Sequence, residues 1–188
     1  MPAGAAPRSV RLFLALVPPP SPRYAELTRE LLAVAPRARP VRDGNWHATL
    51  RFLGNDAHAD EVVAKVAPVA AGTPPLETRM AGVGAFPTPR NARVAWVGLD
   101  APGLQVLATR LAQALPVTSQ AEREFHGHVT LARADPPADL RAFVAAHADL
   151  ELGKCTLREI VLFKSTTTPQ GPVYDPLARF PLAGSSAF

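Results

Sequence analysis

The sequence of 188 residues predicts a fold of mixed strands and helices, arranged as two duplicated lobes around a central cleft. The first reason is that the pattern His-x-Thr-Leu occurs twice, at residues 47–50 and 128–131. A shuffled chain of this composition would contain about 0.04 copies of that pattern. The second reason is that strand-like and helix-like segments follow in the same order around both motifs. The third is the spacing, because the two histidines lie 81 residues apart (128 − 47) and Arg11 and Arg93 lie 82 apart (93 − 11), each just before an apolar run.

The first half opens with the short apolar run VRLFLALV, residues 10–17, which is bounded by prolines and is typical of a buried strand. A helix is predicted over 21–35, because Ser21 is a candidate N-cap, Pro22 takes the first helical position and apolar residues then recur at helical spacing. The remaining elements predicted for this half are a motif strand at 46–53, a helix at 59–70 and a strand at 76–86.

The second half repeats this order. Its predicted elements are a strand at 92–99, a helix at 102–115, a motif strand at 125–133, a helix at 137–148, and closing strands at 156–165 and 172–182. An internal duplication explains the repetition with few assumptions. Two copies of one unit usually pack around a pseudo-two-fold axis, as subunits of homodimers do. Such packing would bring His47 and His128 to opposite sides of one cleft.

Composition sets outer limits on the protein's class. Hydrophobic residues make up 47% and charged residues 19% of the chain, which is ordinary for a globular domain. The net charge of +4 is compatible with a polyanionic ligand, since phosphates attract arginine by charge and by bidentate hydrogen bonding. We expect a single domain over residues 8–183, with flexible termini at 1–7 and 184–188.

The cellular compartment can be inferred from cysteine and from apolar runs. Cys155 is the only cysteine, so no intrachain disulfide can form and a reducing compartment is expected. No apolar run approaches the ~20 residues that a membrane-spanning helix needs. The start of the chain imitates a signal peptide only weakly, because its apolar part is short and is followed at once by prolines. A cytoplasmic protein without a membrane partner is therefore expected, and we also expect it to be a monomer.

Each motif presents an imidazole beside a hydroxyl. Side chains alternate along a strand, so His47 and Thr49 should point to one face, and His128 and Thr130 likewise. Two such faces meeting in a cleft suit acid–base chemistry at phosphorus. One imidazole can take a proton from the attacking group, and the other, when protonated, can donate to the leaving oxygen. Threonine hydroxyls can donate to the nonbridging phosphate oxygens.

Other uses of these histidines are less favoured by their surroundings. A single strand histidine is usually structural, but two in matched motifs indicate catalysis or ligand binding. A metal site is the nearest rival, yet the motifs contain no cysteine pair, no His-x-x-x-His spacing and no acidic residue, so no metal is expected. His126 could share the face of His128 but has Asn45 as its counterpart in the first copy, so we treat it as peripheral. His58 and His147 lie in helix-like stretches and should be surface residues.

The chain resembles the two-histidine phosphoesterase superfamily, and within it the RNA 2′,3′-cyclic phosphodiesterases, also called 2′-5′ RNA ligases. The resemblance covers nearly the whole chain and is carried by RLFLALVPP, HATLRFLG, HVTLAR and IVLFKSTTTPQGPVYDPL. It implies a bilobal α+β fold in which two antiparallel sheets face a central cleft and helices lie outside. One departure is Gly127, because family members often have proline directly before the second motif histidine.

The resemblance also implies site residues. It supports His47, Thr49, His128 and Thr130 and adds Arg133. Strict alternation, however, would place Arg133 on the face opposite His128. Either the strand ends or bulges after Leu131, or Arg133 reaches the phosphate around the edge of the cleft. Alternation instead favours Arg51, which is in phase with His47 and Thr49. The candidate substrate-binding residues are Arg133, Arg51, Arg11, Arg93, Ser165 and Tyr174.

The function that these observations predict is hydrolysis of terminal RNA 2′,3′-cyclic phosphates to 2′-phosphomonoesters, without a metal or other cofactor. The resemblance implies that the same site can also join RNA ends reversibly through a 2′-5′ bond. The expected partner is an RNA with a 2′,3′-cyclic phosphate end, and tRNA halves are among such RNAs. Two alternatives stay open: a phosphodiesterase acting on small cyclic nucleotides or 2′-5′ oligonucleotides, and a non-catalytic RNA-end binding protein.

Overall fold

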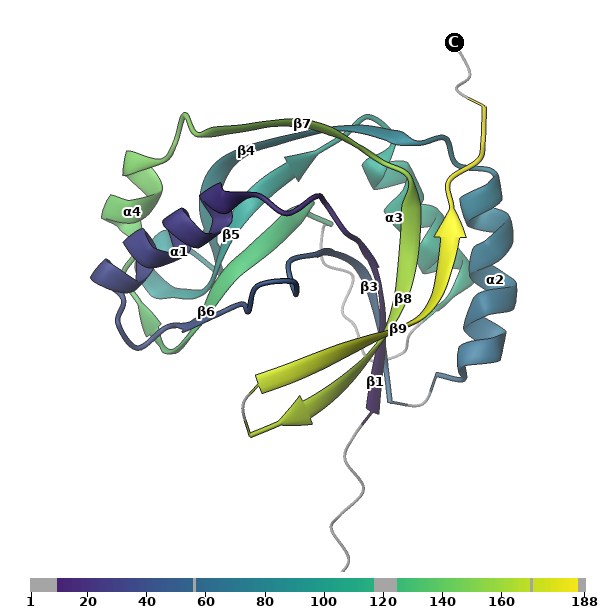
Figure 1. The fold of residues 1–188 in the computed structure, drawn as a ribbon, viewed down its shortest axis with the longest axis horizontal. Helices are drawn as coiled ribbons and strands as arrows, with labels where there is room; N and C mark the ends of the chain where they lie inside the picture. The colour runs from purple at the N-terminus through teal and green to yellow at the C-terminus, as the bar shows by residue number, and fades with distance from the viewer. Residues whose placement is uncertain (1–9, 56, 117–124, 170, 186–188) are drawn as a thin grey trace, which may run out of the picture.

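A computed structural model describes residues 10–55, 57–116, 125–169 and 171–185 of the chain (Figure 1). The strands are β1 (Val10–Leu16), β2 (Arg39–Pro40), β3 (Ala48–Gly54), β4 (Leu76–Phe86), β5 (Ala92–Asp100), β6 (His128–Ala138), β7 (Glu151–Leu157), β8 (Glu159–Thr168) and β9 (Gly171–Pro181). The helices are α1 (Pro22–Val34), α2 (Ala59–Ala71), α3 (Leu104–Ala114) and α4 (Arg141–Ala146), with a 3₁₀ turn at Pro89–Asn91.

The strands form two separate sheets, and all their pairings are antiparallel, which confirms the expected α+β architecture. Sheet A has the order β3-β1-β8-β9, and sheet B has the order β2-β6-β5-β4-β7. Each motif strand lies beside the first strand of its own half, so β3 pairs with β1 and β6 pairs with β5. The strands at 10–17 and 92–99 are therefore equivalent members of different sheets, as the duplication predicts.

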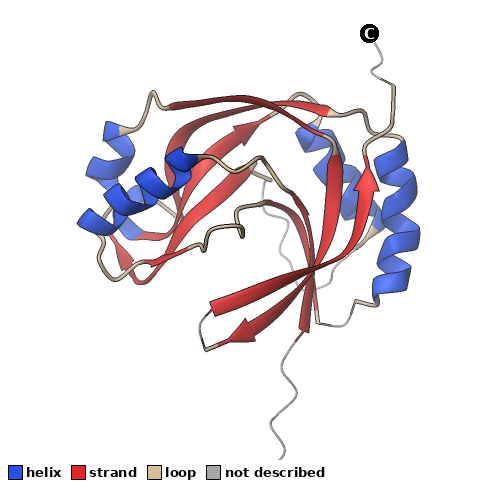
Figure 2. Ribbon diagram, in the orientation of Figure 1, coloured by secondary structure: helices blue, strands red, loops and turns tan. Residues whose placement is uncertain are grey.

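The two halves of the chain exchange elements between the lobes. Helix α1 packs on β6 and α4, and β4 pairs with β5. Both α1 and β4 are therefore part of the lobe of sheet B, although they come from the first half of the chain. Conversely, α3 packs on β3 and α2, and β8 pairs with β1, so these second-half elements belong to sheet A. Figure 2 shows the resulting pairs of helices, α1 with α4 and α2 with α3, on the two sides of the molecule.

Strand pairing in the two sheets follows one offset of 81 residues. The pairs Ala15↔Thr49 and Leu14↔Arg51 in sheet A become Trp96↔Thr130 and Ala95↔Ala132 in sheet B. The internal duplication thus extends to the residue-by-residue register. The offset also corrects the expectation that Arg11 and Arg93 are equivalent. Arg93 corresponds to Leu12, and the counterpart of Arg11 is Ala92.

Some predicted elements differ from the structure. The helix predicted at 137–148 is confined to Arg141–Ala146, because β6 continues through two prolines as far as Ala138. Among the described residues, the pairing of β6 with β2 ends at Arg133, so beyond this point proline removes no ladder hydrogen bond to β2. Strands β2 and β7 were not predicted; β7 has mixed polarity and forms the outer edge of sheet B.

The hydrophobic core lies between each sheet and its helices. Leu14 and Leu16 of β1 are fully buried, as are Val97 of β5 and Leu131 of β6. Burial of such a side chain contributes about 1.5–3 kcal/mol, so the helix-facing sides hold each sheet in place. The opposite sides carry the motif residues. The predicted N-terminal tail lies outside the described residues, while Gly184 donates its N–H to the carbonyl of Thr73 and so extends the packed chain past residue 183.

Helices of the described residues fall short of what a membrane crossing requires in length and apolar character.

Candidate active site

The two motif histidines have the same local hydrogen bonding. Nδ1 of His47 lies 2.7 Å from the carbonyl oxygen of Asn45, and Nδ1 of His128 lies 2.7 Å from that of His126. A carbonyl only accepts, so the proton in each neutral ring belongs on Nδ1 and donates to the carbonyl. Nε2 is then the basic nitrogen of both rings. Each imidazole can accept a proton at Nε2, or donate one there when it is charged.

Aromatic rings of sheet A surround His47. Its ring centroid lies 5.0 Å from that of Phe13, 5.2 Å from Tyr174 in an edge-on arrangement, and 6.4 Å from Phe163. Burial among these rings lowers the pKa of His47 below its ordinary value, although the bond to Asn45 opposes the effect. His47 is therefore mostly neutral near pH 7 and suited to accept a proton.

His128 has a matching aromatic environment on sheet B. Its ring lies 5.1 Å from Phe86, 6.1 Å from Trp96 and 6.5 Å from His126. Burial is again the main cause that lowers the pKa of His128, and the neighbouring His126 and Arg133 add to it. Both histidines are thus half-buried and lined by aromatic rings, His47 immediately before β3 and His128 at the start of β6.

A β-bulge in each motif strand decides which side chains join the histidines. Thr49 pairs with Ala15 and Arg51 pairs with Leu14, so Leu50 is an extra residue without a partner. The same step occurs at Leu131, and an extra residue reverses the alternation beyond it. The residue of β6 that returns to the face of His128 and Thr130 is therefore Arg133, which resolves the conflict between strict alternation and the resemblance.

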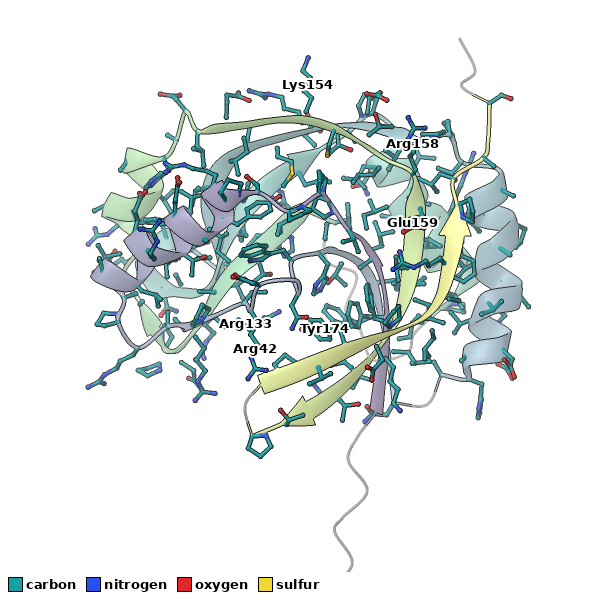
Figure 3. The ribbon with its side chains drawn as sticks, in the orientation of Figure 1. Arg42, Arg133, Lys154, Arg158, Glu159 and Tyr174 are labelled. Atoms are coloured by element: carbon teal, nitrogen blue, oxygen red, sulfur yellow. The ribbon has the colours of Figure 1, made fainter. Side chains whose placement is uncertain are left out.

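Arg133 connects the two lobes electrostatically. Its positive charge lowers the pKa of His128 on its own strand, and also the pKa of His47 across the site. It acts in the same direction on Tyr174, although burial dominates and raises the pKa of that phenol. Figure 3 shows Arg133 directed toward Tyr174 between β6 and the β8–β9 hairpin. The histidine-bearing faces of the two sheets therefore face each other.

We call this region the interlobe site. Its residues are His47, Thr49 and Tyr174 from sheet A, and His128, Thr130 and Arg133 from sheet B. The arrangement places two imidazoles, two hydroxyls and a guanidinium around one space, which is the set needed to hold an anion and to move protons on either side of it.

The expectation that Arg51 shares the face of His47 is wrong, and the bulge at Leu50 is the reason. The Arg51 side chain turns toward α3, where its Nε donates to the carbonyl oxygen of Leu115 at 2.8 Å. This bond satisfies a carbonyl at the end of the helix, and partial burial lowers the pKa of Arg51. Arg51 thus joins β3 to α3. Phe52, the counterpart of Arg133, occupies the face of His47, with its ring 6.0 Å from Phe13.

Three of the remaining candidates form a row across sheet A. Arg11 of β1 pairs with Ser165 of β8, and Ser165 pairs with Tyr174 of β9. Residues directly opposite each other in adjacent strands share a face, and the ring of Tyr174 places that face beside His47. Arg93 differs, because the structure pairs its guanidinium with Oδ1 of Asp135 at 3.4 Å on the exposed surface.

Gly127 also has a structural explanation. A Cβ at this position would lie 2.3 Å from the carbonyl oxygen of Leu99 and 2.7 Å from Cδ2 of Leu104. Moreover, the carbonyl of Gly127 accepts from the N–H of Leu99 at 2.9 Å, so the two segments are drawn together. The chain before β6 approaches β5 so closely that only glycine fits this conformation.

The rings that line the interlobe site were not identified as site residues from the sequence. They are Phe13, Phe163, Phe86 and Trp96. Their signal is weak, because aromatic residues in strands are usually core residues, and only the pairing of the strands shows which face they occupy. Within the described ranges, no group of three or more His, Cys, Asp and Glu side chains is arranged to hold a metal ion.

Comparison with known proteins agrees with this geometry. Residues 19–169 match the model of the 2′-5′ RNA ligase superfamily. An RNA 2′,3′-cyclic phosphodiesterase of Aeropyrum pernix is 33% identical over 172 residues, which cover 87% of this chain and 97% of that protein. One of Thermus thermophilus is 29% identical over 186 residues, covering 93% and 91%.

Solved structures show the same fold. A crystal structure of a Thermus thermophilus protein superposes with a TM-score of 0.75 at 28% identity, covering 93% of this chain and 98% of the other. E. coli LigT in complex with 3′-AMP gives a TM-score of 0.66 at 27% identity, covering 92% and 97%. Because the two His-x-Thr motifs occupy equivalent positions in the two sheets and the family model matches most of this chain, the protein belongs to the 2′-5′ RNA ligase superfamily of two-histidine phosphoesterases.

Proposed function

We propose that this protein hydrolyses terminal 2′,3′-cyclic phosphates of RNA to 2′-phosphomonoesters by acid–base catalysis with two histidines. The observation that carries the proposal is the matched bond from each Nδ1 to a backbone carbonyl, which leaves Nε2 of both His47 and His128 for proton transfer. Relatives named RNA 2′,3′-cyclic phosphodiesterase, at about 30% identity over most of the chain, support the choice of reaction.

The proposed step needs one neutral and one protonated imidazole. The neutral ring takes a proton at Nε2 from a water molecule as its oxygen bonds to phosphorus. The bond from phosphorus to the ribose 3′ oxygen breaks, and the other ring gives its Nε2 proton to that oxygen. The products are a 3′ hydroxyl and a 2′-phosphomonoester. Thr49, Thr130 and Arg133 would donate to the nonbridging oxygens, where negative charge increases in the transition state.

The proposal includes two further expectations from the sequence. The chemistry requires no metal ion, because proton transfer and charge stabilisation are both assigned to side chains. Ligation would follow the same course with the 5′ hydroxyl of a second RNA in place of water: its oxygen bonds to phosphorus, the 3′ oxygen leaves, and a 2′-5′ phosphodiester forms while each histidine keeps its role. Only the opposite reaction, in which the 3′ hydroxyl cleaves that 2′-5′ bond, would exchange the roles of the two histidines. The substrates proposed here include the cyclic phosphate ends of tRNA halves. We further propose that the protein acts as a monomer in the cytoplasm.

Positive charge beside the site favours RNA over a mononucleotide. Arg39 of β2 pairs in register with Arg133, and both side chains are exposed, so the charge of the site continues along the edge of sheet B. Arg42 lies farther along the same segment and approaches Gly171 of the β8–β9 hairpin. Arginines placed in this way can neutralise phosphates of a longer strand.

The test uses purified protein, excess EDTA and an oligonucleotide that ends in a 2′,3′-cyclic phosphate, with the phosphate position of the product identified. We expect a 2′-phosphomonoester, formed roughly 10²–10⁴-fold more slowly by the His47→Ala or His128→Ala protein. His58→Ala is the matched control, because His58 is the N-cap residue of α2, outside the interlobe site, and that protein should keep full activity. A 3′-phosphomonoester, or a rate near that of the unmodified protein after either motif substitution, would contradict the proposal.

A further inference from the structure

A hollow of about 490 Å³ opens beside His128 on sheet B. It is lined by the middle of β4, the C-terminal half of β5, the first turn of α3 and the segment that leads into β6. Its lining includes Trp96, His126, Asp100 and Gln105. Its volume falls within the 300–1,000 Å³ range of small-molecule sites, and we call it the Trp96 pocket.

The indole of Trp96 forms a flat wall of this pocket. A Cβ on Gly84, the residue opposite Trp96 in β4, would lie 2.2 Å from two atoms of the indole ring. The ring therefore passes directly over Gly84, where only glycine leaves it room. His126 lies with its ring 4.7 Å from Trp96, and Phe86 with its ring 5.1 Å away. Sheet B thus carries a cluster of aromatic faces next to the pocket.

The pocket is directly joined to the interlobe site. The rings of Trp96 and His128 are 6.1 Å apart, and the carbonyl of His126 is the group that orients the His128 imidazole. A planar ligand stacked on Trp96 would therefore hold a group attached to it within reach of His128. The aromatic residues around His47 also pack on one another, with Phe13 stacked on Phe163 at 5.3 Å and edge-on to Tyr174 at 5.1 Å. What distinguishes Trp96 is that its ring also lines the 490 Å³ pocket.

We propose that the Trp96 pocket binds the nucleobase of the nucleotide that carries the cyclic phosphate, with the base stacked on Trp96. This inference rests on the proposed function, and it assigns to the pocket the part of the substrate that does not react. Asp100 and Gln105 stand at the rim and are exposed, so they can exchange hydrogen bonds with the edge of the base. Arg79, also at the rim, is held by an ion pair with Glu151.

A binding experiment tests the pocket without turnover. Trp46 and Trp96 are the only tryptophans, so a Trp46→Phe protein reports on Trp96 alone. Titration with adenosine 2′-monophosphate should quench its fluorescence, and titration with ribose 5-phosphate, which has no base, should not. A second comparison uses the Trp96→Phe protein, which keeps only Trp46. Because Trp46 is buried against Tyr24, the nucleotide should not quench the fluorescence of this variant. Equal quenching in the Trp46→Phe and Trp96→Phe proteins, or no quenching in the Trp46→Phe protein, would overturn the inference.

Turnover provides the second test. Stacking on an aromatic side chain gives roughly 5- to 150-fold in affinity per base, so Trp96→Ala should raise KM by that factor with a much smaller change in kcat. Gly84→Ala should act in the same direction by displacing the indole. Gln105→Ala should alter the relative KM of substrates with different terminal bases, whereas Gln113→Ala, an exposed glutamine two turns farther along α3, should not.

The outcomes separate this inference from the proposed function. Cleavage by the unmodified protein with an unchanged KM for Trp96→Ala and Gly84→Ala would refute the pocket assignment and leave the reaction intact. Absence of cleavage by the unmodified protein would instead refute the reaction, and fluorescence quenching would still decide whether the pocket binds a base.

Discussion

Arg133 and Arg51 provide the sharpest test of the site geometry, because each arginine closely follows a His-x-Thr-Leu motif. The bulges at Leu50 and Leu131 direct them differently. Arg133 faces both histidines and lowers the pKa of each, whereas Arg51 donates to the carbonyl of Leu115 on the helix side of sheet A. We therefore expect Arg133→Ala to reduce catalysis and Arg51→Ala to reduce stability.

The magnitudes follow from what each guanidinium contacts. Removing a charged donor from a phosphate oxygen costs about 1.5–3 kcal/mol, so Arg133→Ala should lower kcat/KM by roughly 10- to 150-fold. Loss of the Arg51 bond to Leu115, together with the packing of its stem, should lower the free energy of unfolding by about 1–2 kcal/mol. For a chain of this size that corresponds to a fall in Tm of about 2–8 °C.

The assays are initial rates of cleavage of an RNA with a 2′,3′-cyclic phosphate, and thermal melts followed by circular dichroism. Arg133→Lys is the matched variant, since it keeps the charge but not the planar pair of donors, and it should recover part of the activity. Removing the charge should also raise the pKa of both histidines and move the kcat/KM profile to higher pH. An active Arg133→Ala protein, or an inactive Arg51→Ala protein with an unchanged Tm, would refute the assignment of faces.

Further expectations concern the same site. Because burial lowers the pKa of both His47 and His128, the pH profile of kcat/KM should be bell-shaped with its maximum below about 6.5, and a maximum above about pH 7.5 would contradict this. His47→Ala and His128→Ala should each lower kcat by roughly 10²–10⁴-fold. The loss in the double variant should be far smaller than the two single losses multiplied together, as single-turnover rates would show. Thr49→Ala or Thr130→Ala should lower it about 10- to 100-fold, with melting curves unchanged. Dialysis against EDTA should leave the rate unaltered, and loss of activity restored by one divalent ion would refute metal independence.

The sequence was sufficient to predict the duplication, since the two motifs and the order of elements are visible without a structure. The offset of 81 residues between His47 and His128 holds for the pairing of whole strands. By contrast, the bulge that separates Arg133 from Arg51 could not be located from the residues around it. A bulge adds one residue without requiring a particular side chain, so Leu50 and Leu131 look like ordinary inward-facing strand residues.

The Trp96 pocket and the exchange of elements between lobes were also outside the reach of sequence reasoning. His126 was expected to be peripheral, because no counterpart exists in the first motif. Its role beside Trp96 depends on the register of β5 and β6, which places the indole ring opposite a glycine of β4. Likewise, apolar spacing predicts that a helix such as α1 buries one face but does not say which sheet that face will contact.

The exchange of α1 and β4 for α3 and β8 makes the two halves interdependent in the way of a domain-swapped dimer joined into one chain. Residues 10–86 alone would leave β1 and β3 without β8, and would leave β4 without β5. Neither half can therefore complete a sheet by itself, and unfolding should be a single cooperative event across both lobes. A change that loosens one lobe also displaces the strands beside the other histidine, so the paired imidazoles are preserved or lost together.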